Sequence, residues 1–203
     1  TKFRNCGQVC ISPQRFYVHE NIYDQFLKAV VKHTELLKIG NGLDPETKLG
    51  PLINKNQQQN VLNIIDQAKK ENNKILTGGD IMDKGNFIAP VVIDVTNNNS
   101  EFINKEIFGP VLPLIKFSTK EEVIAKANDT PYGLAAYIWT NNLNDAIYLS
   151  EKLEFGMVGI NEWAPQGTEA PFGGWKQSGL GHESGSEGLY EYLEKKLISI
   201  GNL

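Results

Sequence analysis

The chain has 203 residues, of which 40% are hydrophobic and 22% are charged, and its formal net charge at pH 7 is −4. These values are typical of a soluble globular protein with one buried core, or of one domain with an appendage. The sequence has no excess of basic residues, which argues against nucleic acid as a partner. No apolar run approaches the roughly 20 residues of a membrane span, and the first residues do not resemble a signal peptide.

The first half of the sequence alternates between strand and helix patterns. Residues 15–19 favour a short strand, and apolar side chains then recur at helical spacing from 21 to 39, until Gly40 and Gly42 end the helix. A second helix is expected from Asn54, and Gly78 and Gly79 predict a turn after it. The apolar face of this second helix consists of Val61, Ile64, Ile65 and Ala68. Its polar face, interpreted as solvated surface, consists of Gln57, Gln58, Asn60, Lys69 and Lys70.

The second half continues the alternation. Residues 87–95, 111–117, 134–139 and 157–160 favour strands. Ser118 and Thr119 each stand three residues before a glutamate, so either offers a capping box for the helix that carries Val123, Ile124 and Ala127. Asn141 or Asn142 is expected to cap a helix that packs through Ala146, Leu149 and Leu153. Residues 166–188 predict a loop with at most a short helix, and residues 190–200 look extended.

This alternation predicts an α/β fold with a mostly parallel sheet flanked by helices. The last predicted strand has no neighbour that follows it in the sequence. It must therefore pair with a strand already placed, or with another subunit.

The chain has two cysteines, Cys6 and Cys10. Two cysteines are too few for a disulfide framework, and they suit a reducing cytoplasm. A Cys6–Cys10 disulfide would switch off either thiol, although the spacing is not that of a redox motif. The three histidines are scattered, so no metal site is expected. A free cysteine is usually a small buried hydrophobe, and spacing alone would leave Cys10 in that class.

Four stretches change this interpretation of Cys10. In chain order they are Phe3-x-Asn5-x-Gly7-Gln8-x-Cys10, Glu106-Ile107-Phe108-Gly109-Pro110, Asn128-Asp129-Thr130-Pro131-Tyr132-Gly133-Leu134 and Pro171-Phe172-Gly173-Gly174-Trp175-Lys176-Gln177-Ser178-Gly179. Together and in this order they resemble the NAD(P)-dependent aldehyde dehydrogenases, from the nucleophile to the C-terminus. The resemblance implies that residues 1–180 form the catalytic domain of such an enzyme and that residues 181–203 form a C-terminal segment with an oligomerisation strand at 193–202. Because the chain starts at Thr1 and enters the cysteine signature at once, we expect a fragment or an excised domain.

The resemblance assigns roles to individual residues. It implies that Cys10 attacks the aldehyde carbon as a thiolate, forming a thiohemiacetal and then a thioester. Glu106 is expected to bind the ribose hydroxyls of the nicotinamide nucleotide, and Phe108 to pack beside the nicotinamide ring. The cofactor domain, the general-base glutamate and the oxyanion-hole asparagine of the family lie upstream of the nucleophile, so the isolated chain is expected to be inactive. The choice between NAD and NADP, and between a homodimer and a homotetramer, stays open.

The substrate is the least determined part of this prediction. The segments Lys2-Phe3-Arg4-Asn5, Asn161-Glu162 and 176–181 are most similar to the succinate-semialdehyde dehydrogenases, in which an arginine at the place of Arg4 pairs with the distal carboxylate of the substrate. Gln166 stands where that branch commonly has an assisting serine, and Phe172 is expected to line the aldehyde pocket. Two further departures are Ser12, where a second cysteine is frequent, and His182, where the family usually has arginine.

Two alternatives remain open from the sequence. A cysteine hydrolase or acyltransferase could use Cys10 without a nicotinamide, and it would need His19, His33 or His182 beside the thiol. A non-enzymatic interaction domain could be built around the terminal strand.

Overall fold

The computed structural model of the chain describes residues 1–97 and 100–202. The chain folds into two compact units, Thr1–Asp129 and Thr130–Leu203, which are described separately below. The predicted boundary between residues 180 and 181 separates a catalytic domain from a C-terminal segment. It is a division by function, which this division by packing does not test, and it stays a prediction. None of the described helices has the length and apolarity that crossing a bilayer requires.

The first unit is built on a four-stranded sheet. Its strands lie in the order β1 (Phe16–His19), β4 (Val111–Phe117), β3 (Val91–Val95) and β2 (Lys74–Thr77). β1, β4 and β3 run parallel, and β2 is an antiparallel edge strand. This confirms the predicted α/β class with a mostly parallel sheet, and it adds the edge strand that the sequence analysis missed.

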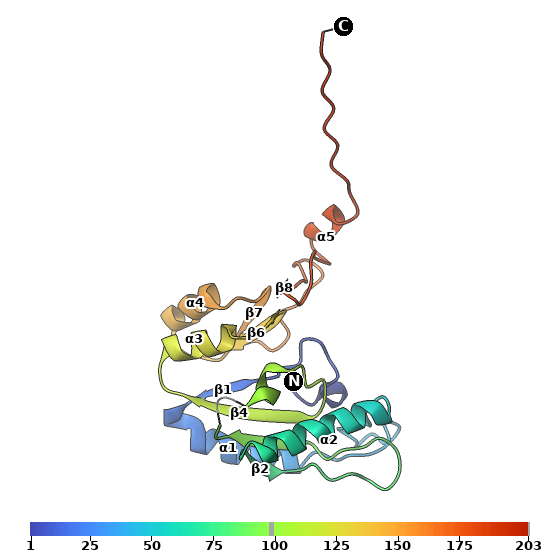
Figure 1. Cartoon of the computed structure of the whole chain (residues 1–203), viewed down its shortest axis with the longest axis vertical. Helices are drawn as coiled ribbons and strands as arrows, with labels where there is room; N and C mark the ends of the chain where they lie inside the picture. Colours follow the sequence, from blue (N-terminus) through green and yellow to red (C-terminus); the bar gives the residue numbers. More distant parts are fainter. Residues whose placement is uncertain (98–99, 203) are drawn as a thin grey trace. The chain divides into compact units, whose positions relative to one another are not determined.

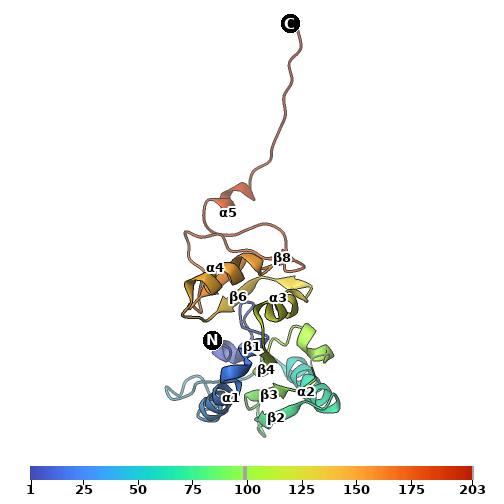
Figure 2. The same cartoon turned by 90° about the vertical axis from the view of Figure 1, so that its left-hand side faces the viewer.

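Each face of this sheet is covered by one long helix, as Figure 2 shows. Alternate residues of a strand point to opposite faces, and the two apolar clusters follow this alternation. The cluster under α2 (Lys55–Lys70) contains Val91, Ile93, Val111 and Ile115 of the sheet, together with Val61, Ile64, Ile65 and Ala68 of the helix. The cluster under α1 (Glu20–Glu35) contains Val18, Val92, Leu112 and Leu114 with Tyr23 of the helix. The predicted apolar face of the second helix is therefore confirmed.

Buried polar contacts fix the helices to the sheet. The hydroxyl of Tyr23 lies 2.6 Å from a carboxylate oxygen of Asp94 and 3.1 Å from the carbonyl oxygen of Leu114. The side-chain nitrogen of Asn73 donates to the hydroxyl of Ser100 at 2.7 Å, which ties the end of α2 to the short helix η2 (Glu101–Asn104). Burial and the neighbouring Asp94 both raise the pKa of Tyr23, so this hydroxyl stays a neutral donor.

Two predicted element boundaries are wrong. The helix expected to reach Ile39 ends at Glu35, because the carbonyl of Lys38 accepts the N–H groups of residues 48 and 49 and residue 39 bridges to Leu49. The strand expected at 87–95 begins only at Val91, because Pro90 has no N–H to donate and residue 88 bridges to Ile81 in an antiparallel sense. By contrast, β4 occupies the predicted residues 111–117.

The helix α3 (Lys120–Asn128) ends the first unit. Of the two capping boxes offered by the sequence, the one at Thr119 forms: its hydroxyl accepts the N–H of Glu122 at 3.2 Å. The side chain of Glu122 in turn accepts the N–H of Ser118 at 2.8 Å. Its salt bridge with Lys126 adds an i, i+4 pair and lowers the pKa of Glu122.

The second unit contains two small sheets, drawn in yellow to orange in Figure 1. β6 (Ala135–Ile138) pairs in parallel with β7 (Met157–Ile160), and α4 (Leu143–Lys152) connects them with Asn142 as its N-cap. β5 (Tyr132–Gly133) pairs in an antiparallel sense with β8 (Trp175–Lys176). One short helix, α5 (Glu187–Tyr190), follows. Residues 193–202 form neither helix nor strand, so the terminal oligomerisation strand stays a prediction.

Candidate functional site

The loop that carries Cys10 begins with a short helix, η1 (Arg4–Gly7), whose backbone is not regular. Asn5 and Cys6 have left-handed backbone angles, with φ of 48° and 58°. The side chain of Asn5 donates to the carbonyl of Gln8 at 3.0 Å, and the side chain of Gln8 donates back to the carbonyl of Asn5 at 3.2 Å. These reciprocal bonds brace the strained turn, as left-handed asparagines do in tight loops.

The two thiols occupy opposite environments. Cys10 is exposed, in a turn closed by the N–H of Ser12 donating to the carbonyl of Val9 at 2.9 Å. Cys6 is 1% exposed, and burial raises its pKa to about 11, although the charge of Lys2 works in the opposite direction. A buried thiol with a raised pKa is a poor nucleophile, because the thiolate is the reactive form. Cys10 is therefore the candidate nucleophile, and Cys6 is a core residue.

Lys2 is an unusual neighbour of this loop. It is 4% exposed, and its ammonium nitrogen has no hydrogen-bond partner among the described residues. Burial lowers the pKa of Lys2 to about 7, while Cys6 acts to raise it. The carbonyl of Lys2 accepts the hydroxyl of Ser12 at 3.2 Å, so the residue in the place of the second cysteine is used as a structural hydrogen-bond donor.

The cysteine loop packs directly against the Glu106–Pro110 motif through two glycines. A Cβ built on Gly7 would lie 2.2 Å from the carbonyl oxygen of Gly109, and Gly7 has a positive φ of 74°. Only glycine permits such an approach between two backbones. Glycine is therefore required at position 7 by the contact with Gly109, which lies about one hundred residues later in the sequence.

Two glutamine side chains reinforce this contact. The side chain of Gln14 donates to the carbonyl of Ser12 at 2.9 Å and accepts the N–H of Ile107 at 3.3 Å. The side chain of Gln57 donates to the carbonyl of Phe108 at 2.8 Å. The interpretation of Gln57 and Gln58 as solvated surface is wrong, because both amides hydrogen-bond to backbone carbonyls of other segments. The sequence analysis missed Gln14, because none of its neighbours in the sequence indicates a bond to Ile107.

Glu106 and Phe108 line a cavity of about 440 Å³ together with the polar face of α2. Glu106 is exposed, and its carboxylate has no partner among the described residues, while Phe108 is half-buried with a positive φ of 44°. The other lining residues include Gln57 and Asn60, which carry amide groups. The amide of Asn60 donates to the side-chain oxygen of Gln57 at 3.3 Å, so the carboxylate of Glu106 is, within the described part of the chain, the free polar group of this lining.

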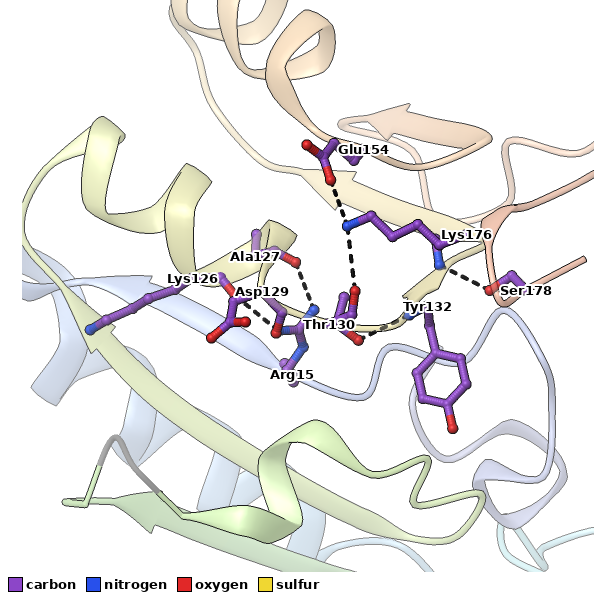
Figure 3. A network of polar contacts seen from close by, with 10 residues as sticks. Arg15, Lys126, Ala127, Asp129, Thr130, Tyr132, Glu154, Lys176 and Ser178 are labelled. Carbon is purple, nitrogen blue, oxygen red and sulfur yellow. Dashed lines mark hydrogen bonds and ion pairs between the residues drawn. The ribbon is translucent and has the colours of Figure 1, made fainter.

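The four motifs meet in two pairs. The first two meet in the first unit, through the glycine contact above. In the second unit β5 and β8 join the third and fourth motifs, where the N–H of Gly133 donates to the hydroxyl of Ser178 at 2.9 Å and the N–H of Gln177 donates to the carbonyl of Pro131 at 2.9 Å. Lys176 forms a salt bridge with Glu154 at 2.6 Å (Figure 3). Segments selected by resemblance alone are thus neighbours in each unit.

Arg15 holds the end of α3 in the first unit, where the third motif begins. Its guanidinium donates to the carbonyls of Lys126 at 2.9 Å and Ala127 at 2.8 Å, and it lies 3.5 Å from the carbonyl of Asp129 (Figure 3). Carbonyls at a helix C-terminus lack partners within the helix, and a cation there also interacts favourably with the helix dipole. The hydroxyl of Tyr17 adds a further bond to the carbonyl of Lys126 at 3.1 Å.

Comparison with known proteins agrees with the resemblance found in the sequence. A family model described as the aldehyde dehydrogenase family matches residues 1–198. The chain belongs to the aldehyde dehydrogenase family. It is 45% identical over 203 residues to a mitochondrial succinate-semialdehyde dehydrogenase of Oryza sativa subsp. japonica, and 42% identical over 203 residues to a succinate semialdehyde dehydrogenase of Acinetobacter baylyi. Both alignments cover 100% of this chain, but only 38% and 42% of the two relatives.

Solved aldehyde dehydrogenase structures share the fold. The crystal structure of an aldehyde dehydrogenase from Brucella melitensis biovar abortus matches with a TM-score of 0.91 at 43% identity, over 95% of this chain and 40% of that one. The NAD⁺ complex of an aldehyde dehydrogenase from Bacillus cereus matches with a TM-score of 0.90 at 42% identity, over 93% of this chain and 39% of that one. These matches confirm the predicted family and fold class.

The remaining predicted residues of this aldehyde dehydrogenase chain lie as follows. Arg4 is exposed in the cysteine loop and has no ion-pair partner among the described residues. Gln166 and Phe172 belong to the second unit, where Gln166 is exposed and Phe172 exchanges two backbone hydrogen bonds of 2.7 Å with Glu183. The ring of His19 caps α1 by accepting the N–H of Asn21. Within residues 1–97 and 100–202, no group of three or more His, Cys, Asp or Glu could hold a metal ion.

Proposed function

We propose that this chain carries the nucleophile and the nicotinamide-ribose contacts of an NAD(P)-dependent aldehyde dehydrogenase that oxidises succinate semialdehyde or a similar small carboxy-aldehyde. The observation that supports it most strongly is the docking of two loops in the first unit. One loop exposes the thiol of Cys10, and the other presents Glu106 and Phe108 at a cavity. Covalent catalysis followed by hydride transfer requires a thiol and a nucleotide contact in fixed positions, and the packing of the two loops supports this.

In the proposed reaction the thiolate of Cys10 attacks the aldehyde carbon. A carbon–sulfur bond forms, the carbonyl electron pair moves to oxygen, and the backbone N–H of Cys10 stabilises that oxyanion. When bound, the nicotinamide ring supplies the acceptor for the hydride. After the oxidation Cys10 holds the acyl group as a thioester, and water cleaves it to a carboxylate and the free thiol. Exposure of Cys10 suits this cycle, since both aldehyde and water must reach the sulfur.

Glu106 and Phe108 orient the nucleotide in this scheme. The unpartnered carboxylate of Glu106 accepts the two hydroxyls of the ribose, and the ring of Phe108 limits the tilt of the heterocycle. The fixed turn at Phe108 supports these roles, because Gln57 holds its carbonyl and Gly109 packs against Gly7. A carboxylate accepting two hydroxyls in one pose provides the orientation that hydride transfer needs.

The proposed substrate follows from Arg4 and from the relatives. The free, exposed guanidinium of Arg4 lies six residues before the nucleophile and is suited to a bidentate pair with a distal carboxylate. The relatives from Oryza and Acinetobacter are named as succinate-semialdehyde dehydrogenases, which favours the same substrate here. We assign Gln166 a hydrogen bond to the substrate and Phe172 a place in the aldehyde pocket.

The remaining parts of the proposal concern the whole enzyme. By analogy with the family, the main cofactor domain and the general base lie outside this chain, and the 203 residues alone are inactive. Residues 193–202, which expose Leu197 (93%) and Ile198 (73%), pair as a strand in a homodimer or homotetramer. The cofactor is NAD or NADP, since one relative is named as NADP(+)-dependent and one related structure holds NAD⁺. A cytoplasmic location is proposed from the cysteine content, although relatives include both cytosolic and mitochondrial enzymes.

The test is an assay of the complete natural protein with succinate semialdehyde and NAD or NADP. Cys10→Ser is expected to abolish turnover, while Gly42→Ala, the control at a position where the added Cβ meets no atom within 4 Å, keeps it. Arg4→Met is expected to raise the KM for succinate semialdehyde at least tenfold and to leave the KM for an uncharged aldehyde of similar length unchanged, because one charge-assisted pair is worth about 1.5–3 kcal/mol. Turnover by Cys10→Ser would refute the nucleophile, and equal effects of Arg4→Met on both aldehydes would refute the substrate.

A further inference from the structure

A single side chain links the two catalytic loops by hydrogen bonds on both of its polar atoms. The amide of Gln14 donates to the carbonyl of Ser12 at 2.9 Å and accepts the N–H of Ile107 at 3.3 Å. Ser12 belongs to the same turn as Cys10, because its own N–H closes that turn on the carbonyl of Val9. Ile107 lies between Glu106 and Phe108 and is 1% exposed.

The turn that Gln14 holds is one that needs support. Phe108 has a left-handed backbone, which costs about 1–2 kcal/mol for a residue with a side chain. Its carbonyl is held from α2 by Gln57 at 2.8 Å. The N–H of Ile107, one residue earlier, is held by Gln14 from the cysteine side. A buried N–H without a partner costs about 1–3 kcal/mol, so this second bond also supports the strained turn.

We infer that Gln14 is a positioning residue of the proposed dehydrogenase. It fixes the cysteine turn relative to the Glu106–Phe108 turn, and so it fixes the Cys10 thiol relative to the bound nucleotide. The inference rests on the proposed function and extends it to a residue that touches neither substrate nor cofactor. The two halves of the amide have separate tasks. The oxygen, through Ile107, governs the nucleotide contacts, whereas the nitrogen, through Ser12, governs the position of the Cys10 turn.

This division is testable with two substitutions at one position in the complete natural protein. Gln14→Leu removes both bonds, and it is expected to raise the KM for the nicotinamide nucleotide and to lower kcat, each about tenfold, as expected for a hydrogen bond worth about 1.4 kcal/mol. Gln14→Glu keeps an acceptor for Ile107 but cannot donate to Ser12 at neutral pH. It is expected to restore the KM for the nucleotide to within about twofold of the wild type while kcat stays low.

Gln58→Leu is the matched control, because Gln58 is also half-buried and donates to a backbone carbonyl, that of Phe87 at 3.2 Å. It is expected to leave both kinetic constants within about twofold of the wild type. The inference is overturned if Gln58→Leu reproduces the effects of Gln14→Leu, if Gln14→Leu changes neither constant, or if Gln14→Glu fails to restore the nucleotide KM. A split between KM and kcat is not expected from a general loss of stability.

Hydrogen exchange separates this inference from the proposed function. If the wild-type protein oxidises no aldehyde, the proposed function fails, and the bridge is judged by amide exchange alone. Gln14→Leu is expected to speed exchange about tenfold at both Ser12 and Ile107, with no change there in Gln58→Leu. Faster exchange in only one of the two turns would overturn the claim that Gln14 couples them.

Discussion

The most direct test of the packing around the cysteine loop is replacement of Lys2 by methionine. Methionine keeps the length of the side chain and removes the buried ammonium group, which has no hydrogen-bond partner among the described residues. Burial lowers the pKa of Lys2 from 10.5 to about 7, so folding disfavours its charged form. We expect Lys2→Met to be more stable than the wild type near pH 7.

The pH dependence has a defined sign. Between about pH 7 and pH 10.5 the unfolded chain binds more protons at Lys2 than the folded chain does, so the free energy of unfolding rises with pH in that window. The slope is at most about 1.4 kcal/mol per pH unit, which gives a gain of about 2 kcal/mol between pH 7 and pH 9. Cys6 acts in the opposite sense: its folded pKa of about 11 exceeds the unfolded 9.0, so its contribution is lost as the pH rises between these values. The net gain is therefore expected to level off above about pH 9.

Urea unfolding followed by circular dichroism, at about pH 7 and about pH 9, measures this effect. The advantage of Lys2→Met over the wild type is expected to shrink by about 2 kcal/mol between the two pH values. Lys55→Met, which removes an exposed lysine, is the control and is expected to show a difference that does not depend on pH. A constant advantage for Lys2→Met, or a variant less stable than the wild type at both pH values, would refute a buried and neutralised lysine.

Three further substitutions test the contacts that hold the first unit together. Gly7→Ala is expected to cost about 3 kcal/mol or more in urea unfolding, because of its positive φ and the approach of Gly109, whereas Gly42→Ala, with no atom within 4 Å of the added Cβ, changes stability by less than about 1 kcal/mol. Tyr23→Phe is expected to cost about 1.5 kcal/mol by removing its buried hydroxyl contacts, measured in the same way. Arg15→Lys is expected to speed amide exchange at the end of α3, since lysine cannot reproduce the guanidinium fork; unchanged exchange would contradict this role.

The parts of the fold that could be predicted are the helices and strands that depend on residues close together in the sequence. The apolar spacing of α2, the apolar run of β4 and the asparagine before α4 predict their elements because each depends on neighbours in the sequence. The end of α1 could not be predicted in the same way. Residues 36–39 continue the apolar pattern, but the carbonyl of Lys38 accepts hydrogen bonds from the N–H groups of residues 48 and 49 instead of continuing the helix. No pattern within residues 36–39 indicates these distant partners.

The candidate site shows the same limit more strongly. Resemblance selected Cys10, Glu106 and Phe108, because those residue types recur in the family. It did not select Gln14, since its role depends on a hydrogen bond to Ile107, 93 positions away. A glutamine between a proline and an arginine carries no sign of its partner. Side chains that bind to the backbone are recognised only when the fold brings that backbone to them.

The contrast between the two cysteines gives the structural reason why only one of them is suited to react. Cys6 is buried in η1, and Cys10 is exposed in the turn four residues later. The backbone leaves Cys6 through two residues with positive φ, Cys6 itself and Gly7, and Asn5 just before them is left-handed as well. Glycine at position 7 lets this turn rest on Gly109, and that contact seats Cys6 in the core while Cys10 is left at the surface. The same turn therefore anchors the loop that carries Cys10 to the Glu106–Pro110 motif.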